Sequence, residues 1–160
     1  MSNLKFIVDN NMGKLVKWLR IMGYDTLFFD GSDDSLMIAT ALAEGRIILT
    51  RDTQIMRRRV VANGQLKAML IKDDKPEQQM HQVIATLNLD CQFKPFAICL
   101  ECNKPLLEMN KQNMKDRVPD YVFQTQNQYM ECPTCHRIYW RGTHWQAMVN
   151  KLKEFTRVQP

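Results

Sequence analysis

The sequence predicts an α/β protein in which a parallel β-sheet, flanked by helices, is followed by a smaller second module. Three observations support this prediction. The first 90 residues alternate between short apolar runs and segments of helical periodicity, two pairs of cysteines follow, and residues 144–155 repeat apolar side chains at helical spacing. Short strands that alternate with helices pair in parallel, because each helix carries the chain back across the sheet. A chain of 160 residues is long enough for one domain and a small module.

The strands of the predicted sheet are short runs of apolar and β-branched residues, and helical periodicity separates them. The strands are expected at residues 4–8, 25–29, 46–50 and 67–72, and the helices at residues 11–22, 34–43, around the arginines at 57–59, and at residues 76–87. Asn10 and Asn11 are candidate caps for the first helix. Gly23 and Gly45 are the expected stops of the first two helices, and Pro76 is the expected start of the last.

Composition limits the class of protein. Hydrophobic residues make up 45% of the chain and charged residues 24%, as in globular proteins. No apolar run approaches the ~20 residues of a membrane span. The first residues lack the basic-then-apolar pattern of a signal peptide, which predicts a cytoplasmic location. The net charge of +5 is compatible with a nucleic-acid partner but does not by itself indicate one.

Acidic residues follow the predicted strands at the points where the strands end. Asp9 follows the first strand, Asp34 lies between the second strand and its helix with Asp33 beside it, and Asp52 follows the third strand. The carboxyl ends of parallel strands meet at one edge of a sheet, so these acids are expected to gather there. Carboxylates at close range repel, and Mg²⁺ or Mn²⁺ would offset that repulsion and activate water against a phosphodiester. The alternative is that each aspartate only caps the helix that follows it.

Four of the five cysteines form two Cys-x₂-Cys pairs, Cys99/Cys102 and Cys132/Cys135. Two residues between thiols let both sulfurs reach one tetrahedral Zn²⁺, and two such pairs complete a site. The 29 residues between the pairs exceed the usual spacing, which an insertion around residues 110–121 would explain. We therefore expect a structural zinc site that folds a segment too short to form a core by itself.

Other roles for these cysteines have less support. A redox pair would be a single Cys-x₂-Cys in a thioredoxin-like context. Covalent haem attachment at the second pair, which His136 follows, would require export and would leave the first pair unused. His136 is an alternative zinc ligand, and the remaining Cys91 is expected to be a packed small residue. The tail helix over residues 144–155 is expected to dock on the first domain or on the zinc module.

Three segments resemble one known family: residues 6–26 (FIVDNNMGKLVKWLRIMGYDT), 41–52 (ALAEGRIILTRD) and 132–145 (CPTCHRIYWRGTHW). In order and spacing they are similar to the Mut-seven C-terminal RNase family, which combines a PIN-like domain with a zinc ribbon. The resemblance extends through about residue 150. It implies a PIN-like nuclease domain over residues 1–92, a zinc ribbon and C-terminal helix over residues 93–160, and cleavage of RNA at an acidic, divalent-metal site.

The resemblance also implies roles for single residues. Asp9 and Asp52 match the family's acids after the first and third strands. Asp34 matches the middle acid, although Asp33 is adjacent. The fourth acid that is usual in PIN nucleases has no clear counterpart, and Asp73 is the candidate. Basic residues close to this edge in the sequence are expected to hold RNA phosphates, and these are Lys14, Lys17, Arg51, Arg57 and Arg58.

The zinc module supplies a second functional hypothesis. Basic and aromatic residues are interleaved from Arg137 to Trp145, including Tyr139, Trp140 and His144, a pattern that suits binding of unpaired bases. Packing of the aromatic residues across a strand explains the same pattern. The chain is therefore expected to be either a metal-dependent ribonuclease or a non-catalytic RNA- or ribosome-associated binding protein. The set of acids at the strand ends favours the ribonuclease.

Overall fold

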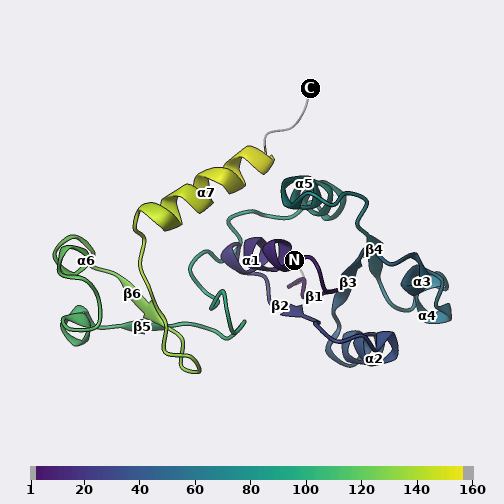
Figure 1. The fold of residues 1–160 in the computed structure, drawn as a ribbon, viewed down its shortest axis with the longest axis horizontal. Helices are drawn as coiled ribbons and strands as arrows, with labels where there is room; N and C mark the ends of the chain where they lie inside the picture. Colours follow the sequence, from purple (N-terminus) through teal and green to yellow (C-terminus); the bar gives the residue numbers. More distant parts are fainter. Residues whose placement is uncertain (1–2, 157–160) are drawn as a thin grey trace.

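The first half of the chain forms a four-stranded sheet in which every strand is parallel to its neighbours. The computed structural model describes residues 3–156. The strands lie in the order β2-β1-β3-β4 (Figure 1). They are β1 (Phe6–Val8), β2 (Thr26–Phe28), β3 (Ile47–Thr50) and β4 (Ala68–Leu70). All four strands end at one edge, and the predicted fold class is confirmed.

Helices cover both faces of this sheet (Figure 1). One face packs under α1 (Gly13–Ile21) and α5 (Pro76–Leu87), and the other packs under α2 (Asp34–Glu44), α3 (Thr53–Met56) and α4 (Arg59–Ala62). Side chains alternate along β1, so that Phe6 and Val8 enter the first core and Ile7 enters the second. Because both faces are buried, β1, β3 and β4 are apolar apart from Thr50 at the end of β3.

The first helix differs from the prediction at its start and agrees with it at its end. Met12, and not Asn10 or Asn11, occupies the cap position, without a side-chain cap bond. The expected cap was wrong because Asn11 takes φ +73° and its amide donates to the side chain of Asn10. Gly23 ends the helix at φ +96°. A Cβ there would lie 2.3 Å from the carbonyl oxygen of Lys94, so glycine is required where the later chain crosses the end of α1.

The segment around the arginines forms two short helices, and the prediction of one continuous helix was wrong. Arg58 has φ −59° and ψ 140°, which interrupts the helical backbone between α3 and α4. Ile55 and Val61 are buried on either side of this break. A continuous helix would place Arg58 and Arg59 on the same face as Ile55, because side chains three and four residues apart share a face. The break keeps both arginines exposed.

The second module is a three-stranded antiparallel ribbon with a helical insertion. Its strands are β5 (Leu107–Met109), β6 (Tyr129–Glu131) and β7 (Ile138–Tyr139), paired in that order. The insertion between the cysteine pairs contains the 3₁₀ helix η1 (Lys111–Met114) and α6 (Asp120–Thr125). Both elements pack on the ribbon around a small core of their own, formed by Met114, Val118, Val122 and Tyr129.

The last helix, α7 (Thr143–Thr156), packs against the first domain. Three of its apolar side chains are buried in the core on the α1 face of the sheet, and these are Trp145, Leu152 and Phe155. The ring of Phe155 meets Trp18 edge-on, with 5.5 Å between centroids. Of the two docking surfaces considered, α7 therefore uses the first domain, while the domain boundary after residue 92 stays a prediction. Within residues 3–156, no helix is long and apolar enough to cross a membrane.

Candidate functional site

The Thr-Arg-Asp triplet at the end of β3 connects two of the predicted acids. The side chain of Thr50 is fully buried, and its hydroxyl donates to Asp9 Oδ2 at 2.8 Å. The hydroxyl oxygen of Thr50 also accepts the backbone N–H of Asp52, at 3.0 Å. Arg51, between them, is exposed. Because Asp9 follows β1 and Asp52 follows β3, one threonine holds together the ends of two neighbouring strands.

The third predicted acid, Asp34, lies within electrostatic range of the other two. Burial raises the pKa of Asp34, and the charges of Asp52 and Asp9 raise it further. Asp33 has a different role, since its Oδ1 accepts the backbone N–H groups of Ser35 and Leu36 and caps α2. We name the three gathered carboxylates, Asp9, Asp34 and Asp52, the acidic edge.

Two carboxylates of the acidic edge, those of Asp9 and Asp52, also accept hydrogen bonds from the backbone that follows them. Asp52 Oδ1 accepts the N–H of Gln54 at 2.8 Å and caps α3. Asp9 Oδ1 accepts the N–H of Asn10 at 2.9 Å. Asp73, the candidate fourth acid, also has a local partner, because its Oδ1 accepts the N–H of Lys75 at 2.9 Å. The aspartates are therefore fixed by the adjacent backbone, and capping alone does not distinguish a structural acid from a functional one.

Arg58 approaches the acidic edge from the break between α3 and α4. Its Nη1 donates to Ser35 Oγ at 3.3 Å. Its positive charge opposes the burial and the carboxylates that raise the pKa of Asp34. Arg57 is exposed at the C-terminal end of α3. Of the three arginines predicted to contact RNA, the structure thus brings Arg58 into electrostatic range of the carboxylates.

The two predicted lysines lie beside a separate groove. Lys14 and Lys17 line a cavity of about 780 Å³, whose wall also includes Asn11 from the loop after β1 and Glu101 from the first cysteine turn. We name this cavity the α1 groove. Lys17 Nζ lies 3.4 Å from Glu101 Oε1, and both side chains are substantially exposed. Lys17 is therefore paired with the ribbon, and Lys14 lies on the same exposed side of α1.

The four predicted zinc ligands come together. The sulfurs of Cys99, Cys102, Cys132 and Cys135 all lie within 4.8 Å of one another, the one such group of three or more metal-binding side chains among residues 3–156. Cys99 Sγ and Cys135 Sγ are 3.7 Å apart. Sulfurs on a tetrahedral Zn²⁺ at about 2.3 Å are about 3.8 Å apart, so donor set and spacing fit zinc. Cys91 is outside this group, and burial raises its pKa to about 11, as suits a packed thiol.

The two cysteine pairs adopt the same turn. In each pair the backbone N–H of the second cysteine donates to the sulfur of the first, at 3.4 Å and 3.5 Å. The next residue, Asn103 or His136, has a positive φ of 60° or 64°. Its N–H donates to the carbonyl of the first cysteine at 3.0 Å or 2.9 Å. His136 is thus a turn residue, and its Nδ1 lies 3.1 Å from Glu131 Oε2.

The cysteines differ in how easily they ionise, because a contact with the Cys135 sulfur and then burial raise the pKa of Cys102 to about 12, whereas the pKa of Cys132 is lowered. Burial acts to raise the pKa of Cys132, but the backbone N–H groups of Cys135 and Thr134 outweigh it and lower the pKa to about 7. The hydroxyl of Tyr139 lies 3.2 Å from Cys99 Sγ. Burial, and then this contact, raise the pKa of Tyr139, so its hydroxyl stays protonated and can donate to the sulfur. Tyr139 therefore packs on the four-cysteine centre.

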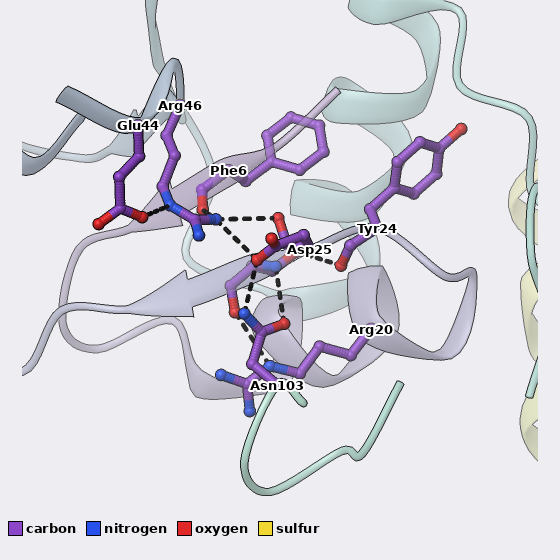
Figure 2. Close-up of polar contacts among 8 residues, drawn as sticks. Phe6, Arg20, Tyr24, Asp25, Glu44, Arg46 and Asn103 are labelled. Carbon is purple, nitrogen blue, oxygen red and sulfur yellow. Dashed lines mark hydrogen bonds and ion pairs between the residues drawn. The ribbon is translucent and has the colours of Figure 1, made fainter. Parts of the chain in front are cut away.

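A polar network connects the first cysteine turn to the edge of the sheet (Figure 2). The Asn103 amide accepts the N–H of Thr26 at 2.9 Å and donates to Asp25 Oδ1 at 2.6 Å. The buried Arg20 donates to the carbonyl of Thr26 at 3.0 Å and to that of Leu100 at 2.7 Å. β2 is an outer strand, so these side chains satisfy backbone groups that its open edge would leave unpaired.

Arg46 continues this network at the start of β1, where it contacts Phe6 (Figure 2). Its Nη1 donates to Asp25 Oδ1 at 2.8 Å and to the carbonyl of Phe6 at 3.1 Å, and its Nε donates to Glu44 Oε1 at 2.7 Å. Burial opposes ionisation of Asp25, but hydrogen bonds from Arg46 and Asn103 outweigh burial and lower its pKa. An ionised Asp25 therefore joins the first cysteine turn to the sheet.

Thr50 and Asn103 position these sites, and the sequence patterns did not predict either as a site residue. The pattern predicts Thr50 only as the end of a strand, although a threonine two residues before an aspartate can bond to the following backbone. Asn103 was not singled out, although asparagine tolerates the left-handed conformation that follows a cysteine turn. The contact of Asn103 with β2 spans 77 residues of sequence, and no local pattern indicates it.

The sheet, the acidic edge and the four-cysteine centre together define an α/β domain joined to a ribbon that has a site suited to zinc. Residues 4–152 match the family model of the Mut7-C RNAse domain, nearly the whole chain. The protein therefore belongs to the Mut7-C RNAse domain family, as the three sequence segments predicted. No curated protein and no solved structure matched the chain.

Proposed function

We propose that the protein is a metal-dependent ribonuclease that hydrolyses RNA phosphodiester bonds at the acidic edge. The observation that carries the proposal is the gathering of three carboxylates from three strand ends. Asp52 and Asp9 both contribute to the raised pKa of Asp34, after burial. Membership of an RNase-domain family supports the reaction class.

Asp9, Asp34 and Asp52 would hold Mg²⁺ or Mn²⁺, which prefer carboxylate oxygens. Such a cation supplies an activated water and neutralises charge on the phosphodiester. The protein contributes rigid positions, because Thr50 orients Asp9 and the first turn of α3 orients Asp52. Burial, and then the charges of Asp52 and Asp9, oppose ionisation of Asp34, and a bound cation would offset this repulsion.

Arginine side chains beside the acidic edge are suited to hold RNA phosphates, since guanidinium groups donate to two phosphate oxygens at once. Arg58 lies next to Ser35 and within electrostatic range of Asp34. Arg51 and Arg57 are exposed on the neighbouring turns. We assign these three residues to substrate binding, with Lys14 and Lys17 further along the α1 groove.

A non-catalytic RNA-binding protein is the second candidate. Two observations favour it. The four sulfurs are gathered within 4.8 Å, whereas the three carboxylates are not among the residue groups that meet this distance within residues 3–156. Asp73, the candidate fourth acid, is bonded to the start of α5. On this account the zinc ribbon binds RNA and the acidic edge is structural.

The substitution Asp52→Asn separates the two candidates. Asparagine caps a helix about as well as aspartate, so α3 keeps its cap while the edge loses one charge. We expect Mn²⁺-dependent cleavage of single-stranded RNA to fall by at least about 100-fold, with zinc content unchanged. Asp90→Asn is the matched control, because Asp90 Oδ1 also accepts a nearby N–H, that of Gln92, away from the edge.

Full activity in Asp52→Asn would exclude the acidic edge as the site of cleavage. If neither the wild-type protein nor the variant cleaves RNA, but both bind it, the binding protein becomes the better account. Loss of activity in Asp90→Asn as well would show that the effect comes from general destabilisation.

A further inference from the structure

A second groove lies on the zinc ribbon, away from the acidic edge. Its volume is about 800 Å³, and its walls come from α1, the first cysteine turn, α6, β7 and the start of α7. We name it the ribbon groove. It contains none of the three carboxylates, so the proposed cleavage reaction does not account for it.

Two aromatic side chains line this groove without a full set of packing partners. Tyr121 on α6 is 70% exposed. Trp140, which follows β7, is half-buried against the small ribbon core. Gly142 makes room for the indole ring, since a Cβ there would lie 2.9 Å from Trp140 Nε1. The ring of Trp140 thus packs over Gly142 and also lines the groove, where it could stack with a planar base.

The other aromatic residues of this segment are used for packing. The Tyr139 hydroxyl contacts Cys99 Sγ and accepts the N–H of Leu100 at 3.1 Å. Trp145 is only 7% exposed, and its ring packs edge-on against Phe96 with 4.7 Å between centroids. The packing explanation is therefore correct for Tyr139 and Trp145, and Tyr121 and Trp140 are left for a ligand.

The charge of the ribbon groove favours an anionic ligand. Arg137 is exposed, and no acidic side chain pairs with it within residues 3–156. Arg117 also lines the groove, although both of its Nη atoms bond to Glu131, at 2.8 Å and 3.0 Å. The one acidic residue in the wall is Glu101, which pairs with Lys17. Arg137 is accordingly the cation available to a phosphate.

The two grooves share part of their walls. Lys17, Leu100 and Glu101 line both the α1 groove and the ribbon groove. The α1 groove reaches Asn11, two residues after Asp9 in the loop that follows β1. The two grooves are therefore adjacent along α1, and the α1 groove borders the loop that begins at Asp9.

We propose that the ribbon groove binds unpaired bases of the RNA strand whose backbone reaches the acidic edge. Bases stack on Tyr121 and Trp140, Arg137 pairs with a phosphate, and the strand continues past Lys17 along α1. This inference rests on the proposed function, and it adds a second binding site that selects single-stranded RNA long enough to span both grooves.

The test measures RNA binding separately from cleavage. Fluorescence anisotropy is recorded for labelled oligouridylates of 4 and 16 nucleotides and for an RNA duplex, in an Asp52→Asn background with zinc bound and no added Mg²⁺ or Mn²⁺. Tyr121→Ala and Arg137→Gln change exposed side chains, so both variants should fold. Each should weaken binding of the 16-mer by about 5- to 50-fold. Binding of the 4-mer should be weakened less, and binding of the duplex should not change.

Leu107→Ala is the matched control, because Leu107 is a ribbon residue with 54% exposure that does not line the groove. It should bind the 16-mer like the background protein. Equal binding by Tyr121→Ala, Arg137→Gln and the control would overturn the proposal, and so would equal losses on single-stranded and duplex RNA. In either case, the proposed ribonuclease would still be supported if Asp52→Asn loses cleavage and Asp90→Asn does not. RNA binding that is absent from every protein would reject the ribbon groove and leave a partner protein as its ligand.

Discussion

Thr50 holds the acidic edge together through one buried hydroxyl. It donates to the carboxylate of Asp9 and accepts from the backbone of Asp52, so it satisfies groups from two different strand ends. Its side chain is fully buried, and solvent cannot replace these bonds without a rearrangement. Thr50 is thus a positioning residue, which touches the proposed metal ligands and not the substrate.

Replacing Thr50 with valine tests this role. Valine has a similar shape but no hydroxyl, so Asp9 Oδ2 and the Asp52 N–H lose their partner. We expect a loss of about 1–3 kcal/mol in the free energy of unfolding and weaker Mn²⁺-dependent RNA cleavage, with a raised Mn²⁺ requirement. Thr50→Ser keeps the hydroxyl and should restore both the Mn²⁺ requirement and cleavage. A valine variant with a normal Mn²⁺ requirement would contradict the role.

Asp33 and Asp34 are adjacent and have different environments, which a paired substitution reveals. Asp33→Asn keeps the cap of α2 and should retain cleavage. Asp34→Asn should abolish it. Because the folded-state pKa of Asp34 is raised, its protonated form is favoured by folding, and that stability is lost as the pH rises through the pKa. Asp34→Asn should therefore raise the melting temperature at pH 7 without added Mg²⁺ or Mn²⁺.

Thermal unfolding of both variants between about pH 3 and pH 8 is the measurement, because this range includes the ordinary pKa of an aspartate. The advantage of Asp34→Asn over wild type should shrink as the pH is lowered towards the pKa of Asp34. A pH-independent difference would contradict the raised pKa of Asp34, and loss of cleavage in Asp33→Asn alone would show that Asp33 is the middle acid.

At the scale of elements, strands were easier to predict than the turns around them. β3 was recognisable because Ile47, Ile48 and Leu49 are consecutive apolar residues. Its end placed Asp52 at the edge, because parallel strands share a direction. The break between α3 and α4 was not predicted, because it depends on which residues the sheet can bury. The cap of α1 was missed for a similar reason, since the positive φ of Asn11 is set by the loop and not by its side chain.

The two cysteine turns have the same backbone but different surroundings, which allows a controlled comparison. Asn103→Gly keeps the positive φ and removes the bonds to Thr26 and Asp25. We expect a loss of about 2 kcal/mol in the free energy of unfolding, because one of the two bonds involves a charged group. His136→Gly removes a side chain at the equivalent position of the other turn, where the side chain is exposed, and should cost less than about 1 kcal/mol.

Urea unfolding of the zinc-loaded proteins measures this difference. Equal losses in the two variants would show that Asn103 acts only within its turn, and that the contact with β2 contributes nothing measurable.

At the scale of the whole molecule, the two ends of the chain share one core. α7 buries Trp145, Leu152 and Phe155 against the face of the sheet that α1 covers, and the first cysteine turn is joined to β2 (Figures 1 and 2). The amphipathic pattern of the tail predicted a docked helix. Its choice of surface was not predictable, because both modules offer apolar faces and only the folded positions of the ribbon and sheet distinguish them.

Zinc should therefore stabilise more than the ribbon. The purified protein is expected to contain about one zinc per chain. Cys132→Ser should lose the metal, expose the ribbon to proteolysis and lower the melting temperature of the first domain, because Asn103 and Arg20 lose a fixed partner. Metal analysis and limited proteolysis test this prediction. A ribbon that stays protease-resistant without metal would contradict it, as would bound haem.

The most direct test of the account is to locate Mn²⁺ by anomalous diffraction in crystals of the zinc-bound protein. We predict a manganese peak among the carboxylates of Asp9, Asp34 and Asp52, at about 2.2 Å from their oxygens, separate from the zinc peak at the four cysteines. The peak should disappear in Asp52→Asn crystals. A wild-type crystal in which the acidic edge binds no Mn²⁺ under conditions that support RNA cleavage would contradict the account.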